Sequence, residues 1–256
     1  MYNLLRNQYL CLTFLLVILF ICLLFTSQAY LQSELEPNDK KEQANELKSG
    51  ESVEGFFQEK RDEDWYKLTV NVPGKNILRI DLSAVPEVDS YLEFYDDKGN
   101  HLKTYNAGEK GEAEAAINLG VTEGIYYLKV GARYDMNQND SYTLKTQLTG
   151  PWQEGQEFES NDKKDWANKL ELGEDMNGFF HERDDRDWYK LTVNVPGKNI
   201  LRIDLSAVPE VDSYLEFYDD KGNYSKTYNV IKEGEAEAAI NLGVTEGIYY
   251  LKVGAC

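Results

Sequence analysis

The amino-acid sequence predicts an all-β protein built from two tandem antiparallel β-sandwich domains. The stretch Asp64–Asn100 returns unchanged as Asp187–Asn223, and Gly111–Ala132 returns unchanged as Gly234–Ala255. Within each copy, short segments alternate apolar and polar side chains, and turns rich in Gly, Asn and Asp separate them. Each copy spans roughly 100 residues, which is a normal size for one independent domain. The duplication favours a binding or spacer protein.

Residues 1–29 are predicted to be a signal peptide. Arg6 is the only basic residue before the apolar run Tyr9–Phe25, and Ser27 and Ala29 stand at the small-residue positions of a cleavage site. The alternative is an uncleaved anchor, because the apolar run is just long enough to span a bilayer. In that case this segment would be the only contact with a membrane. Either way, we expect a secreted or extracellular protein, attached to the cell surface in the second case.

The first sandwich is expected over residues 33–149 and the second over residues 157–256, with a linker over residues 150–156. Period-two alternation predicts six strands in the first sandwich. A short helix with Asp39 as its N-cap is compatible with Lys40–Leu47. The second copy stops before any counterpart of the last strand, so we expect its sandwich to lack that strand and to expose an edge. The predicted strands of the first copy are 65–70, 78–82, 91–95, 117–119, 126–130 and 142–146.

Composition and motifs exclude several classes of function. The formal net charge of −18 argues against nucleic-acid binding, which needs clustered Lys and Arg. The sequence has no Gly-x-Ser-x-Gly elbow, no His-Glu-x-x-His zinc motif and no glycine-rich phosphate loop. Neither histidine recurs in the other copy, because Tyr224 replaces His101 and Gln58 stands where the second copy has His181. We therefore expect a protein that is not an enzyme.

Several short motifs follow one another along the first copy. They are Glu36-Pro37-Asn38-Asp39, Gly55, Asp62-x-Asp64-x-Tyr66, Leu92-x-Phe94-Tyr95-Asp96-x-x-Gly99, Gly124-x-Tyr126-Tyr127-Leu128-x-Val130 and Tyr142-x-Leu144. This order resembles the bacterial pre-peptidase C-terminal domain, a family that includes the collagen-binding domains of secreted bacterial collagenases. The resemblance covers Glu34–Leu148 and, again, Glu157–Ala255. It implies a jelly-roll-like sandwich, an extracellular location and a non-catalytic role beside secreted peptidases, although no peptidase domain is present here.

Acidic and amide side chains gather where the chain enters each domain, and two aspartates precede the first core strand. Ca²⁺ prefers oxygen ligands of these kinds, and a cation would relieve the repulsion between carboxylates. In the collagen-binding relatives, a segment of this type and later aspartates hold calcium. Alternatively, the acids form a solvated segment in which Asp39 and Asp162 cap short helices. The resemblance implies the candidate calcium ligands Glu34, Glu36, Asn38, Asp39, Asp62 and Asp64, and in the second copy Glu157, Glu159, Asn161, Asp162, Asp185 and Asp187.

Trp65, Tyr91, Tyr95 and Tyr127 fall on the outward phase of their predicted strands and are candidates for a ligand-binding face. Exposed rings bind extended polymers because they bury area with little loss of entropy. The collagen-binding relatives use tyrosines in this manner. The alternative is that these rings pack under loops or edge strands.

The sequence therefore predicts a secreted, non-catalytic, calcium-binding tandem module. Its expected partner is an extracellular protein or polymer, such as cell-wall or matrix material, or the module attaches its own chain to the cell surface. The alternative hypothesis is an accessory or propeptide-like segment that aids secretion or folding of a peptidase, or a fragment of a larger secreted peptidase.

Overall fold

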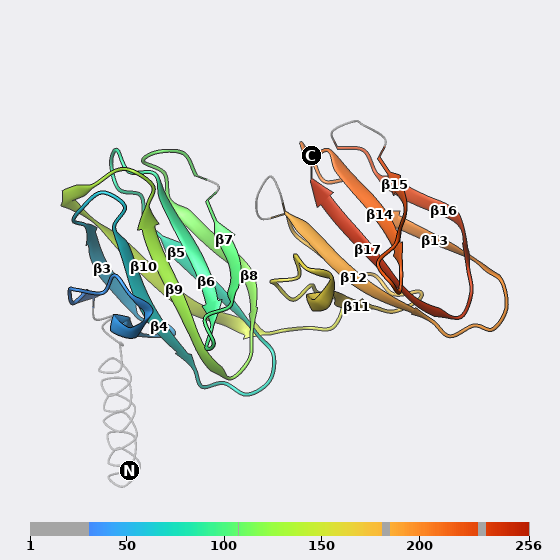
Figure 1. The fold of residues 1–256 in the computed structure, drawn as a ribbon, viewed down its shortest axis with the longest axis horizontal. Helices are drawn as coiled ribbons and strands as arrows, with labels where there is room; N and C mark the ends of the chain where they lie inside the picture. Colours follow the sequence, from blue (N-terminus) through green and yellow to red (C-terminus); the bar gives the residue numbers. More distant parts are fainter. Residues whose placement is uncertain (1–30, 107, 181–184, 230–233, 256) are drawn as a thin grey trace, which may run out of the picture. The chain divides into compact units, whose positions relative to one another are not determined.

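The structure is a computed structural model of the whole chain. It describes residues 31–106, 108–180, 185–229 and 234–255 (Figure 1). The account below concerns the compact unit that begins at Gln32. The predicted signal peptide lies outside the described residues. Among the residues described, no helix is long and apolar enough to cross a membrane.

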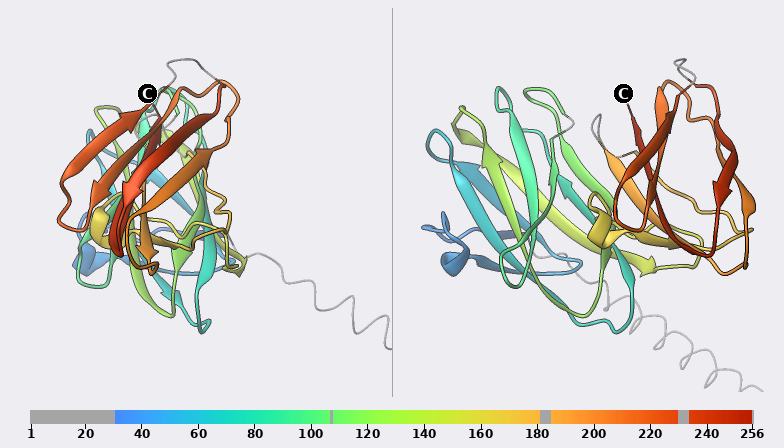
Figure 2. Two further views of the ribbon diagram at one scale, coloured as in Figure 1. Left: turned by 90° about the vertical axis from the view of Figure 1, so that its right-hand side faces the viewer. Right: turned by 45° about the vertical axis from the view of Figure 1, so that its right-hand side comes forward.

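The first repeat folds, over residues 31–151, into two five-stranded sheets that form a β-sandwich (Figures 1 and 2). One sheet has the order β1–β3–β10–β5–β8 and the other has the order β2–β4–β9–β6–β7. β2 pairs with β4 in parallel. The other pairs of this sheet, β4–β9, β9–β6 and β6–β7, are antiparallel. The strands are β1 (Leu31–Ser33), β2 (Asn45–Lys48), β3 (Ser52–Phe57), β4 (Glu63–Val70), β5 (Asn76–Leu82), β6 (Ser90–Asp96), β7 (His101–Tyr105), β8 (Glu114–Val121), β9 (Gly124–Ala132) and β10 (Asn137–Pro151).

The predicted alternation is confirmed, since all six expected strands lie within observed strands. On β4, Tyr66, Leu68 and Val70 are buried while the residues between them are half-buried. Phe57 and Tyr142 join them in one core cluster between the sheets, so each strand contributes every second side chain to the interior.

The expected helix over Lys40–Leu47 was wrong. Only Lys41–Gln43 forms a helical turn, the 3₁₀ element η1, and Lys40 precedes it without a side-chain cap. Asp39 is therefore not an N-cap. The chain then enters β2, where Asn45 and Leu47 are buried and the residues beside them are exposed. Pairing with β4 overrides a weak helical preference, because it satisfies the backbone and buries Leu47.

The second repeat, residues 157–256, reproduces one sheet and only part of the other. Its complete sheet has the order β11–β12–β17–β14–β15, and its second sheet contains only β13 and β16. Within the residues described, this second sheet has no counterpart of β10. The elements are η2 (Lys164–Trp166), β11 (Asn168–Leu170), β12 (Arg186–Val193), β13 (Asn199–Leu205), β14 (Ser213–Asp219), β15 (Tyr224–Tyr228), β16 (Glu237–Val244) and β17 (Gly247–Ala255).

The missing strand changes the environment of identical residues. In the first repeat, β10 pairs along the whole length of β5, and Ile77 is 5% exposed. Its copy on β13, Ile200, is 76% exposed. Leu78 is fully buried, whereas its copy Leu201 is only half-buried. The second core is therefore smaller and less protected from water than the first.

Candidate functional site

The first acidic cluster consists of Glu34, Glu36 and Asp64. One carboxylate oxygen from each lies within 4.8 Å of the other two. Glu34 and Glu36 belong to the entrance segment after β1, and Asp64 lies on β4. The fold therefore brings together three of the predicted ligands. The second acidic cluster, formed by their copies Glu157, Glu159 and Asp187, meets the same condition and is buried.

Hydrogen bonds hold the entrance segment, Glu34–Asp39, against two strands. The Glu34 amide donates to the Glu54 carbonyl over 2.8 Å, and the Glu34 carboxylate accepts from the Phe56 amide over 2.7 Å. The Asn38 carbonyl accepts from the Trp65 amide over 3.0 Å. These contacts anchor the segment to β3 on one side and to β4 on the other. The carboxylates consequently converge because the backbone that carries them is fixed.

Asn38 is fully buried beside the carboxylates and adds an amide oxygen to the candidate ligands. The end of its amide that faces them lies 2.9 Å from both Glu36 and Asp64, and its nitrogen can donate to both. Turning the amide over presents its oxygen instead, so the same side chain serves the cluster with or without a cation. Asn161 repeats this arrangement, at 2.9 Å from Asp187 and 3.1 Å from Glu159.

Two buried tyrosines, which the sequence analysis named only as strand and motif residues, lie against the first cluster. The Tyr66 hydroxyl donates to Glu34 over 2.9 Å, and the Tyr142 hydroxyl lies 2.7 Å from Asp64 and 3.0 Å from Glu34. Their own oxygens are 2.5 Å apart. The alternation signal placed both rings in the core but gave no information about their hydroxyl groups. In the second repeat, Tyr189 donates to Glu157 over 3.2 Å.

Burial dominates the electrostatics of both clusters. Desolvation, followed by the neighbouring Glu34 charge, raises the pKa of Asp64 to about 9, against an ordinary value of 3.8. Desolvation also raises the pKa of Glu36 and that of Asp187. With its pKa at about 9, the Asp64 carboxyl is neutral near pH 7 unless a cation offsets the cost of its charge. This is the electrostatic condition that a bound divalent ion would relieve.

The remaining predicted ligands have different surroundings. Asp62 is buried, and one of its oxygens accepts from the Gln58 amide in the β3–β4 turn. Asp39 is exposed, yet its charge, like that of Asp62, raises the pKa of Glu36. Their copies Asp185 and Asp162 both contact Lys103. All four residues therefore lie near a cluster without joining its closest oxygens.

The candidate aromatic face lies on the outer side of the sheet that contains β4, β9 and β6. Trp65 packs on Tyr95 with ring centroids 5.0 Å apart. Beside them, the Lys129 ammonium forms ion pairs with Glu93 at 2.7 Å and Glu63 at 3.0 Å. The second repeat keeps most of this grid, since Trp188 packs on Tyr218 at 4.9 Å and Lys252 pairs with Glu216 at 2.5 Å.

Tyr127 and Tyr91 occupy the same face. The Lys41 ammonium lies 4.4 Å from the centre of the Tyr127 ring. The Tyr91 ring crosses Gly131, where an added Cβ would lie 2.3 Å from the ring, so only glycine fits below it. All four candidate rings are half-buried. They therefore pack against one another and against lysines, and they remain accessible.

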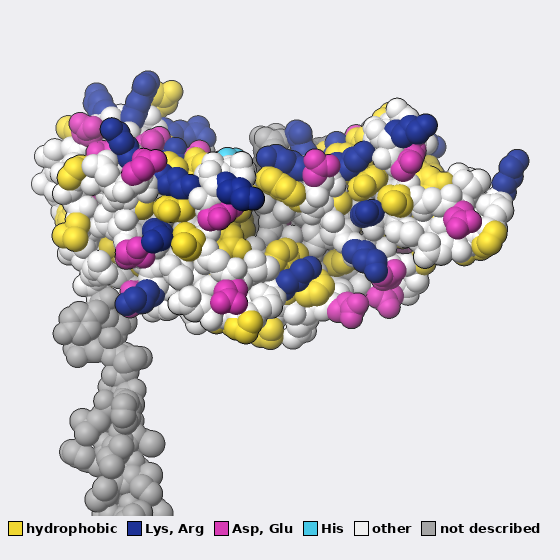
Figure 3. All heavy atoms as spheres, turned by 60° about the horizontal axis from the view of Figure 1, so that its bottom comes forward, with side chains coloured by type: hydrophobic (Ala, Val, Ile, Leu, Met, Phe, Trp, Pro, Cys, Tyr) yellow, Lys and Arg dark blue, Asp and Glu magenta, His cyan; other side chains and the backbone are white. Residues whose placement is uncertain are grey.

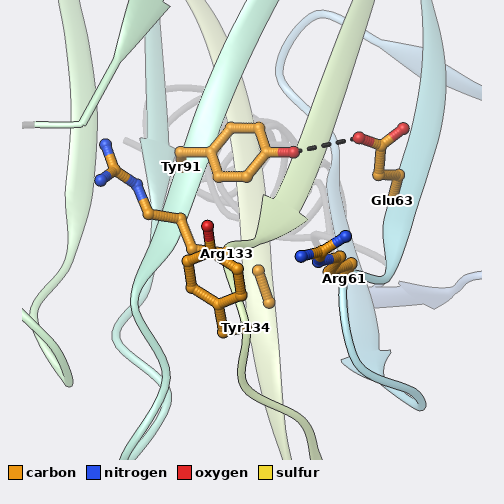
Figure 4. Close-up of a pocket in the computed structure, with 6 residues that line it drawn as sticks. Arg61, Glu63, Tyr91, Arg133 and Tyr134 are labelled. Carbon is orange, nitrogen blue, oxygen red and sulfur yellow. Dashed lines mark hydrogen bonds between the residues drawn. The ribbon is translucent and has the colours of Figure 1, made fainter.

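Tyr91 also lines a shallow pocket of about 310 Å³ (Figure 4). Its hydroxyl donates to Glu63 over 3.1 Å. Arg61 and Arg133 flank the rings of Tyr91 and Tyr134 from opposite sides. The Arg61 guanidinium lies 5.1 Å from the centre of the Tyr134 ring. On the side of the molecule drawn in Figure 3, hydrophobic side chains lie interspersed with charged ones, without a continuous apolar patch.

Comparisons with known proteins show what the chain is similar to. No family model and no curated protein matches it. Among solved structures, the pre-peptidase C-terminal domain of a Bacillus anthracis collagenase is 18% identical over 44% of this chain and 100% of its own, with a TM-score of 0.32. A putative secreted protein from Eubacterium rectale is 11% identical over 88% of this chain and 77% of its own, with a TM-score of 0.28. The PBSX exported protein XepA is 11% identical over 82% and 83% of the two chains, with a TM-score of 0.26. At these scores the assignment of β-sandwich repeats rests on the strand order of this chain itself.

Proposed function

We propose that this protein is a secreted, non-catalytic tandem module that binds calcium at an entrance segment and an extracellular protein or polymer on its aromatic sheet face. The observation that carries the metal site is the convergence of Glu34, Glu36 and Asp64 around the buried amide of Asn38. This donor set is all oxygen, as Ca²⁺ requires. Two of its members, Asp64 and Asn38, are fully buried, which distinguishes the set from an ordinary acidic surface.

Calcium would supply positive charge that the first acidic cluster otherwise lacks. Glu34, Glu36, Asp64 and the Asn38 oxygen would hold it. Since Glu34 is anchored to β3 and Asp64 belongs to β4, the ion would tie the entrance segment to both sheets of the sandwich. Its role in this proposal is structural: it stiffens the repeat on which the binding face is displayed.

Calcium titration of the full chain by calorimetry tests the metal site, together with thermal melts in calcium and in chelator. We expect Asp64→Asn to weaken binding at the first cluster at least tenfold, equivalent to about 1.4 kcal/mol. Asp97→Asn, which changes an exposed aspartate in the β6–β7 turn, should bind calcium as the original chain does. An unchanged titration for Asp64→Asn, or an unchanged melting midpoint in chelator, would remove the metal site from the proposal.

The binding face is supported by the repetition of the Trp–Tyr pair and the Lys–Glu ion pair in both repeats, because two similar surfaces on one chain increase avidity for a repeating ligand. Pull-down from surface extracts, cell-wall material and collagen in the presence of calcium would identify the ligand. The double change Trp65→Ala and Trp188→Ala should reduce capture at least tenfold. Ile200→Ala is the control, since this exposed apolar residue lies on β13 in the other sheet. Equal capture by the original chain and the double variant contradicts the assignment of the face.

A further inference from the structure

Lys103 of the first repeat reaches the acidic residues of the second. Its ammonium nitrogen lies 2.9 Å from Asp162 and 3.5 Å from Glu159, and it donates a hydrogen bond to Asp185. The Lys103 side chain is 2% exposed, and those of Glu159 and Asp185 are fully buried. A lysine buried to this degree needs carboxylate partners, because an unpaired buried ammonium is costly.

The lysine changes the charge of the second acidic cluster. Glu159 is a member of that cluster, and its carboxylate faces Glu157 and Asp187 within 4.8 Å. Lys103 therefore places one positive charge against the same group of acids that calcium would neutralise. A divalent ion bound by this cluster and the Lys103 ammonium would repel each other. Each would therefore lower the affinity of the cluster for the other.

Among the residues described, no lysine pairs with the first acidic cluster. Within the part of the chain that the structure describes, the ion pairs include none that involves Glu34, Glu36 or Asp64. Tyrosine hydroxyls and the Asn38 amide are their polar neighbours instead. The two clusters have the same acids but different sources of compensation.

The duplicated sequence shows that this contact belongs to the junction between the repeats. Lys226 is the copy of Lys103 on β15, and its ammonium lies 4.7 Å from the centre of the Tyr228 ring. Backbone contacts support the same junction: the Gly120 amide donates to the Glu159 carbonyl over 2.7 Å. The Trp152 indole packs against Phe158 and, over 4.4 Å, against the Lys75 ammonium.

We propose that Lys103 is the built-in cation of the second acidic cluster. The first cluster takes calcium, whereas the second serves as an ionic lock that fastens the second repeat to the first without a metal. The calcium part of this inference rests on the proposed function, but the lock does not.

The test compares Lys103→Met with Lys226→Met in the full chain, since methionine keeps the length of the side chain and removes its charge. Calcium bound per chain is measured by equilibrium dialysis. The original chain and Lys226→Met should hold one ion tightly, and Lys103→Met should gain a second ion. Two equally tight ions in the original chain, or one ion in Lys103→Met, would overturn the assignment of the second cluster.

The lock is tested separately in chelator by hydrogen exchange of the Gly120 amide. We expect exchange at least tenfold faster in Lys103→Met and unchanged exchange in Lys226→Met and in Lys103→Arg, which retains the charge. Equal exchange in all four proteins refutes the lock. If no protein binds calcium, the proposed metal function fails, and the exchange rates still decide whether Lys103 holds the junction. Circular dichroism of each variant confirms that it is folded.

Discussion

Tyr142 and Asp64 are separated by 78 residues in the sequence, yet the tyrosine hydroxyl lies 2.7 Å from the aspartate carboxylate. This contact joins β10 to β4 across the sandwich and brings a donor to a buried acid. Asp187 is the copy of Asp64, but the described part of the second repeat has no counterpart of Tyr142. The two acidic clusters therefore contain the same acidic residues, but only the first receives a hydroxyl group from β10.

Tyr142→Phe should destabilise the metal-free protein by about 1–3 kcal/mol, because the carboxylates of Asp64 and Glu34 lose a buried donor. Calcium should restore part of the loss, since the ion neutralises the same oxygens. Urea denaturation with and without calcium measures both effects. Tyr134→Phe is the control, because that ring is 67% exposed. A loss that is equal with and without calcium would separate Tyr142 from the cluster.

Stability of the metal-free protein should fall as pH rises from about 4 to about 9. Burial raises the pKa of Asp64 to about 9, so the folded state binds a proton that the unfolded state releases above pH 3.8. The stabilising contribution of the protonated group is complete below pH 3.8 and is lost as pH rises through the folded-state pKa. Denaturant midpoints across this range, in chelator, measure the effect of Asp64 by comparison with Asp64→Asn, which should show a flatter profile.

Calcium binding at pH 7 should release about one proton per ion, because burial keeps the Asp64 carboxyl protonated until the ion binds. Calorimetry in buffers with different ionisation enthalpies counts the protons. Binding heats that do not depend on the buffer would show that Asp64 is already charged before calcium arrives.

Gly120→Ala should open the junction between the repeats, whereas its copy Gly243→Ala should not. A Cβ at Gly120 would lie 2.5 Å from the Phe158 ring and 2.6 Å from the Glu159 carbonyl oxygen, and a Cβ at Gly243 meets nothing within 4 Å. We expect about 1–3 kcal/mol of destabilisation for Gly120→Ala alone. Small-angle scattering should show a larger radius of gyration for this variant. Matching scattering profiles for the two variants would refute the close packing at Gly120.

Leu78→Ala should cost more stability than Leu201→Ala, although the two leucines occupy identical positions in the repeat. Leu78 is fully buried in the first core, on β5 beside β10, so its removal should cost about 2–5 kcal/mol. Leu201 is half-buried on β13, where the surroundings can relax into the space. Chemical denaturation of both variants, monitored separately for each repeat by hydrogen exchange, makes the comparison. Equal losses would mean that the missing strand does not weaken the second core.

The repeated sequence was sufficient to predict the fold class and the six expected strands, because alternation along a strand is a local property. The outward phase of Trp65 and Tyr95 followed from the same alternation. Clustering of Glu34, Glu36 and Asp64 was anticipated from the resemblance to a family of secreted domains. Local preference failed at Lys40–Leu47, where pairing of β2 with β4 outweighs a helical tendency.

Other features depend on residues that meet only after folding. The hydroxyl of Tyr142 and the ammonium of Lys103 reach their acidic partners across 78 and 82 residues of sequence, and no local pattern encodes such contacts. Ile77 and Ile200 show the same limit most directly. Their neighbours in sequence are identical, yet one is buried and the other is exposed, because a side chain's environment is set by the strands that pack around it.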